Sequence, residues 1–255
     1  MSKLLLFLLL FVPCSAFAAA KSADLSDLKD FGTIEKLMLF GEHEKPRPEQ
    51  LYLRSLRDEL TKTPASERAD LLRKLADETK WGTYQRFMAY SVCVWYGIDY
   101  TKTRDYITHA TFWWEWKIGT DADEPFNLSD VGIDFLYALY ERNHDFKILH
   151  DIITTKSDAA VSELIIGFTL DAVEKHPRGV LHVAAISEKG RDLAWKLLHL
   201  SPRDEDHPLY ILYYTEDALN GFRAYVTKVA NDPKDSLSSL AKRLVAKSNK
   251  NAKGR

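Results

Sequence analysis

Residues 141–153 of the chain read ERNHDFKILHDII, and residues 173–185 read VEKHPRGVLHVAA. At this offset of 32 positions three residues match: His144 with His176, Leu149 with Leu181, and His150 with His182. Ile133 also falls on Ile165 at the same offset. Each unit is then predicted to be one long helix, a tight turn and a shorter helix. A period in the thirties that is built from helix pairs is typical of an α-solenoid.

The rest of the chain also reads as helix, because clean apolar/polar alternation and hairpin turns are scarce. Capping side chains stand directly before proline at Thr63, Ser201 and Asp232, which is a signature of helix starts. The predicted helices span residues 24–39, 49–62, 65–79, 82–96, 102–118, 129–143, 145–155, 158–175, 177–186, 189–200, 209–229 and 234–247. Asn220-Gly221 is predicted to kink or break the helix over 209–229.

These patterns predict an all-α fold in which antiparallel helix pairs stack as a short α-solenoid. An irregular multi-helix bundle is the alternative. Over residues 129–200 the pattern resembles HEAT-like helical repeats, a resemblance that implies an architecture and no activity.

The N-terminus, MSKLLLFLLLFVPCSAFAAA, has the features of a secretory signal. Lys3 precedes an apolar run that is too short to span a bilayer, and Ala16-Phe17-Ala18 fits a signal-peptidase site. We expect residues 1–18 to be the signal peptide, with cleavage after Ala18 or Ala20, and the product to be periplasmic or secreted. Lipidation at Cys14 is disfavoured, because the residue before it is proline rather than a small residue.

The mature chain is predicted to be a single helical domain over residues 21–247 with a basic, disordered tail over 248–255. Cys93 is then its one cysteine, and its apolar surroundings favour a buried, inert thiol. The full chain has 35 basic and 37 acidic residues, a balance that argues against nucleic-acid binding. No later segment is long and apolar enough to be a transmembrane helix.

The repeated histidines do not predict a metal site. His144 and His150 are six residues apart, as are His176 and His182, whereas zinc ligands on one helix are usually three or four apart. We expect these side chains to be structural, with His144 and His176 at helix C-termini. The acidic cluster Asp121, Asp123 and Glu124 lacks the rest of a calcium-loop pattern. No cofactor is predicted, and because no familiar catalytic motif is present, a binding protein is favoured over an enzyme.

Residues 81–118 hold twelve aromatic side chains, including the three tryptophans of TFWWEWKIG at 111–119. On a helix over 102–118, Trp113 and Trp114 fall on the face expected to be core. A second face would carry Trp116, Phe112, His109 and Asp105. These four residues are a candidate ligand-binding cleft, with His109 and Asp105 as weak catalytic candidates, although burial of this face against a neighbouring helix is the alternative.

A second aromatic segment supplies Tyr210, Tyr213 and Tyr214, a residue type that is common in protein interfaces. We therefore expect an exported helical-repeat protein that binds another protein as a scaffold, adaptor or inhibitor. The alternative is a cell-envelope enzyme or glycan-binding protein that uses the cleft around Trp116, His109 and Asp105.

Overall fold

The computed structural model describes residues 25–26, 28–38, 48–78, 84–98, 100–112, 117–118, 126–155, 159–212 and 215–246. Its α-helices are α1 (Phe31–Leu37), α2 (Pro48–Lys62), α3 (Arg68–Glu78), α4 (Tyr84–Trp95), α5 (Tyr100–Phe112), α6 (Leu128–Asn143), α7 (Phe146–Thr154), α8 (Ala159–Lys175), α9 (Pro177–Ile186), α10 (Glu188–His199), α11 (Glu216–Asn231) and α12 (Ser238–Ala246). A 3-10 helix, η1 (Ala65–Glu67), and an antiparallel pair of two-residue strands, β1 (Lys117–Ile118) and β2 (Phe126–Asn127), complete the described elements. The prediction of an all-α fold is confirmed. Within the described residues, no helix is long and apolar enough to cross a membrane.

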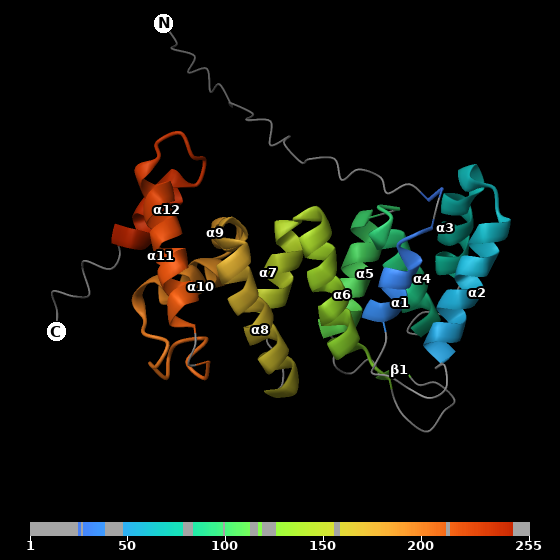
Figure 1. The fold of residues 1–255 in the computed structure, drawn as a ribbon, viewed down its shortest axis with the longest axis horizontal. Helices are drawn as coiled ribbons and strands as arrows, with labels where there is room; N and C mark the ends of the chain where they lie inside the picture. The colour runs from blue at the N-terminus through green and yellow to red at the C-terminus, as the bar shows by residue number, and fades with distance from the viewer. Residues whose placement is uncertain are drawn as a thin grey trace, which may run out of the picture.

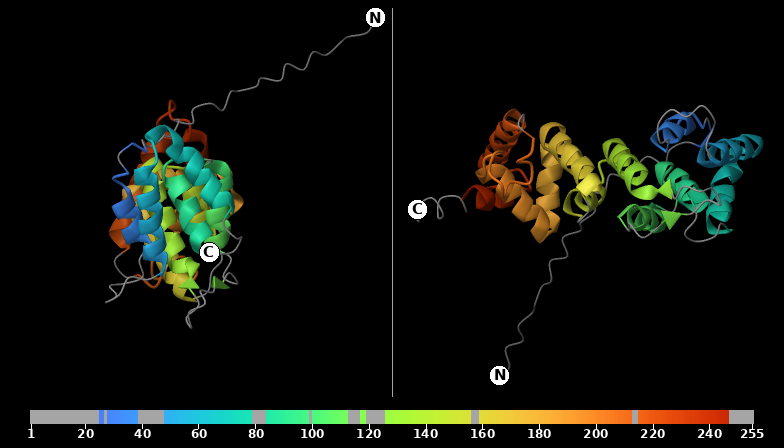
Figure 2. Two further views of the ribbon diagram at one scale, coloured as in Figure 1. Left: turned by 90° about the vertical axis from the view of Figure 1, so that its right-hand side faces the viewer. Right: turned by 90° about the horizontal axis from the view of Figure 1, so that it is seen from below.

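The helices follow one another along the long axis of the molecule, from α2 and α3 at one end to α11 and α12 at the other (Figure 1). In the central part, α6 packs on α7 and α8 packs on α9 as helix pairs, and the pairs stack so that α6 contacts α8 and α7 contacts α9. The view from below shows the same succession of helices along the long axis (Figure 2). The stacking of antiparallel pairs is therefore present where the 32-residue offset predicted it.

Equivalent positions of the two central units are buried. Leu149 and Leu181 are both fully buried, and Ile133 and Ile165 form one small apolar cluster. The tight turn of the first unit begins at His144, whose φ of 54° ends α6 and whose N–H donates to the Tyr140 carbonyl at 2.7 Å. A residue in this left-handed conformation is a common way to end a helix.

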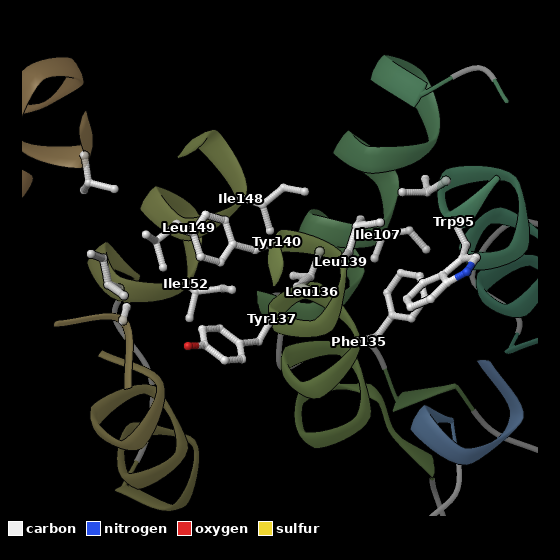
Figure 3. Close-up of a cluster of buried hydrophobic side chains, with 14 of the residues drawn as sticks. Trp95, Ile107, Phe135, Leu136, Tyr137, Leu139, Tyr140, Ile148, Leu149 and Ile152 are labelled. Carbon is white, nitrogen blue, oxygen red and sulfur yellow. The ribbon is translucent and has the colours of Figure 1, made fainter. Parts of the chain in front are cut away.

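The core runs through α6, which has apolar side chains on two faces (Figure 3). Phe135 faces Trp95 of α4, with 5.8 Å between ring centroids, and Tyr140 lies on the α7 side near Leu149. Two apolar faces are expected for a helix that packs between two neighbours in an array.

The N-terminal segment is tied to a helix far along the chain. Arg142 of α6 donates to the Asp30 carboxylate at 2.6 Å, and the Trp95 indole N–H donates to the same carboxylate at 3.1 Å. The Arg142 guanidinium also lies 4.7 Å from the Trp95 ring centroid, a cation–π geometry. We call Asp30, Trp95 and Arg142 the N-terminal clasp, because they join α1 to both α4 and α6.

Several helix predictions are wrong in part. The helix predicted over 24–39 begins at Phe31, and the helix predicted over 234–247 begins at Ser238. The helix predicted over 102–118 ends at Phe112, and Lys117 and Ile118 form β1. The helix predicted to begin at residue 209 begins at Glu216, because buried His207 and Leu209 hold the preceding segment in turns, with the His207 Nδ1 accepting from the Leu209 N–H at 2.9 Å.

Helix α11 also continues unbroken through Asn220-Gly221. A glycine inside a helix costs about 1 kcal/mol relative to alanine. Here that cost is outweighed by the burial of apolar side chains on the same helix, which are Leu219, Phe222, Val226, Val229 and Ala230.

Candidate functional site

A groove lies between α10 and α12 near the C-terminal end of the array, and local interactions fix both helices. The Ser187 hydroxyl accepts from the Gly190 N–H at 3.0 Å and caps the start of α10. At the other end of α10, Arg223 donates to the carbonyl oxygens of Leu198 at 3.0 Å and Leu200 at 2.8 Å. The His199 Nε2 donates to the Leu244 carbonyl of α12 at 2.9 Å, so the C-terminal turns of the two helices are joined directly.

The groove has a volume of about 350 Å³ and is lined by seven residues, which are Glu188, Arg191, Asp192, Trp195, Leu240, Arg243 and Leu244. We call it the α10–α12 groove. Its α10 residues recur at helical spacing and therefore share one face. Leu240 and Leu244 are buried and give an apolar floor, whereas the Trp195 side chain is half-buried beside them. The Trp195 ring packs against His199, with 5.2 Å between centroids.

Two acidic and two basic side chains line the groove. Asp192 pairs with Lys196 at 3.2 Å, and Glu188 is in the first turn of α10, where the helix dipole favours a negative charge. Arg191 and Arg243 are exposed, and neither forms an ion pair with any residue in the described part of the chain. Arg191, Arg243 and Lys196 face the two carboxylates Glu188 and Asp192, so the groove with Lys196 carries one net positive charge.

The structure brings part of the predicted α5 site to the surface. Asp105 and His109 are both exposed and lie one turn apart on α5. The Asp105 carboxylate accepts two hydrogen bonds from Arg104, at 2.7 Å from Nη2 and 3.2 Å from Nε. Phe112 is the last residue of α5, and its side chain lies outside the described structure, as does the whole of Trp116. The cleft around these residues stays a prediction.

The predicted partner-binding tyrosines are described only in part. Tyr210 is 45% exposed, and the next residue, Ile211, is 44% exposed, so two large apolar side chains are accessible in the segment before α11. Tyr213 and Tyr214 lie outside the described residues.

Three of the four repeated histidines, His144, His176 and His182, lie in contacts between helices, whereas His150 bonds to Asp151 and Thr154 of its own helix. The Tyr140 ring meets His144 and His176 edge-on, at 5.9 Å and 5.4 Å, and the two imidazoles are 5.8 Å apart across the unit boundary. His182 stacks on Phe146 at 4.0 Å, and burial lowers the pKa of His182, with a further contribution from the charge of Arg178. Among the described residues, no three His, Cys, Asp or Glu side chains are placed to hold one metal ion.

Sequence reasoning missed the α10–α12 groove. The signal on α10 was the spacing of Trp195 from Asp192, Arg191 and Glu188, which puts a tryptophan on a charged helix face. That pattern gives no indication of the partner helix, because α12 is separated from α10 by the whole of α11.

The chain was compared with protein-family models, curated proteins and solved structures, and none of the three comparisons found a match.

Proposed function

We propose that this protein is an exported helical-repeat binding protein that holds a segment of a partner protein in the α10–α12 groove. A scaffold, an adaptor and an inhibitor all act through such a contact. Export is proposed from the signal-like N-terminus alone. The observation that carries the binding proposal is the half-buried Trp195 beside the buried Leu240 and Leu244 in a groove of about 350 Å³.

The composition of the groove supports a protein segment as the ligand. Binding sites for peptides combine an apolar surface for one or two anchoring side chains with polar groups at the rim. Tryptophan and arginine are among the residues that most often contribute strongly to interface affinity. The groove contains one tryptophan and two arginines, Arg191 and Arg243.

The proposal can be tested by selecting peptides from a displayed random library on the purified protein and measuring their binding by fluorescence anisotropy. A peptide in the groove should change the tryptophan emission of the wild type. Trp195→Phe should abolish that change and keep binding within a few-fold, because phenylalanine retains most of the apolar surface. Trp95→Phe is the matched control, since Trp95 is buried in the N-terminal clasp and its loss should leave the emission change intact.

Persistence of the full emission change in Trp195→Phe would place the peptide elsewhere on the protein and refute the proposal. A selection that yields no peptide whose binding alters Trp195 emission would refute it as well.

A further inference from the structure

The rim of the α10–α12 groove favours a ligand that carries negative charge. Arg191 on α10 and Arg243 on α12 line the same cavity, and neither pairs with a described acidic residue. Of the two carboxylates of the groove, Asp192 pairs with Lys196, which leaves Glu188 alone against the two guanidiniums of Arg191 and Arg243. Helix α12 adds Lys242 and contains no acidic residue at all. Two unpaired guanidiniums over one cavity are a recognition element for carboxylates, because their donors match both oxygens of the group.

The floor of the groove favours an apolar side chain at the centre of the same ligand. Leu240 and Leu244 are 7% and 5% exposed, and Trp195 leaves part of its ring accessible beside them. A bulky aliphatic or aromatic side chain can cover this surface and remove it from water. The charged rim then lies on either side of the buried anchor.

The C-terminal residues of the chain itself do not suit the groove. Residues 247–255 contain Lys247, Lys250, Lys253 and Arg255 and no acidic residue. Their charge has the same sign as that of Arg191 and Arg243. Like charges at an interface are unfavourable, so an external ligand of opposite charge is the better occupant.

We infer that the α10–α12 groove binds an acidic segment of a partner protein, in which one bulky apolar residue packs on Trp195 and flanking Asp or Glu residues pair with Arg191 and Arg243. This inference rests on the proposed function and adds the chemical class of the partner. Lys242, beside Arg243 on α12, then adds to the attraction and raises the rate of encounter with an acidic partner at low ionic strength.

The test uses three synthetic peptides of equal length: an acidic peptide with a central leucine, the same peptide with serine in place of leucine, and a version with every Glu replaced by Lys. The acidic leucine peptide should bind most tightly, and the other two should each bind at least about tenfold more weakly. Arg191→Glu combined with Arg243→Glu should weaken the acidic peptide about tenfold or more and strengthen the lysine peptide. Lys36→Glu combined with Lys62→Glu is the matched control, because both lysines are exposed on α1 and α2, and this variant should bind as the wild type does.

Failure of the acidic-ligand inference and failure of peptide binding in the groove give different results. If library-selected peptides change Trp195 emission but show no enrichment in Asp and Glu, the proposed function stands and this inference is overturned. If no selected peptide changes Trp195 emission, both fail together. Binding to phosphatidylglycerol vesicles that depends on Arg191 and Arg243 and exceeds binding to the acidic peptide would assign the groove to a membrane surface and overturn the inference.

Discussion

Gly179, in the first turn of α9, offers a sharp test of the packing between the two central units. A methyl group at this position would overlap the phenolic oxygen of Tyr140 and would lie 3.0 Å from Leu149 Cδ2. Overpacking of a core contact typically costs about 1 to 3 kcal/mol, and we expect a strain energy of this order at Gly179. Replacing glycine with alanine in a helix recovers up to about 1 kcal/mol. We therefore expect Gly179→Ala to lower the free energy of unfolding by up to roughly 2 kcal/mol.

The same structure predicts which second change reduces the penalty. Tyr140→Phe deletes the oxygen that the new methyl group would strike and leaves the ring in place. In the Tyr140→Phe background, Gly179→Ala should therefore destabilise less, because only the close contact with Leu149 and the ring carbon remains, giving a coupling energy of about 1 to 2 kcal/mol between the two positions. Urea unfolding followed by far-ultraviolet circular dichroism on the four proteins of the cycle measures this value.

Gly221→Ala is the control for helix propensity, because Gly221 is exposed on α11 and a methyl group there would meet nothing within 4 Å. It should stabilise the protein by about 0.5 to 1 kcal/mol. The packing argument is wrong if Gly179→Ala destabilises equally in both Tyr140 backgrounds, or if it stabilises as much as Gly221→Ala.

Two further predictions concern pH and thiol chemistry. Because burial lowers the pKa of His182 below the ordinary value of 6.5, the unfolded chain binds a proton more readily, and stability is lost as the pH falls through and below that value. Between pH 8 and 5 the free energy of unfolding of the wild type should fall more than that of His182→Phe, which keeps an aromatic ring against Phe146; parallel curves would contradict this. Cys93 is 1% exposed, so a thiol reagent should label it only after denaturation. If cleavage removes Cys14, the denatured exported protein should yield one labelled thiol per chain, and the uncleaved protein two.

The sequence predicted the repeated part of the fold well because its determinants are local. The turn between α6 and α7 is set by His144 and by Asp145, whose side chain caps α7 by accepting from the Lys147 N–H at 2.9 Å. Pro177 occupies the first turn of α9. Signals of this kind lie within a few residues of the element they define, so periodicity and capping rules can detect them.

Predictions failed where distant residues decide the structure. The turns between α10 and α11 depend on Arg223, which reaches back to the Leu198 and Leu200 carbonyls, and on the burial of His207. The α10–α12 groove likewise depends on the packing of α12 against α10, two helices that α11 separates in the chain. Local propensity carries no information about either arrangement, because the competing helical conformation of residues 209–215 is locally acceptable.

The N-terminal clasp has a consequence for how the array unfolds. A stack of helix pairs in which each pair touches only its neighbours can lose pairs one at a time from either end. Asp30 and Arg142 are 112 residues apart in sequence, yet their contact joins the first helix to the sixth. Opening the stack anywhere between them requires this contact to break or the intervening helices to separate together. The contact between α1 and α6 thus ties together the two ends of this part of the chain, and in the other part α11 likewise contacts α8 as well as its chain neighbours α10 and α12.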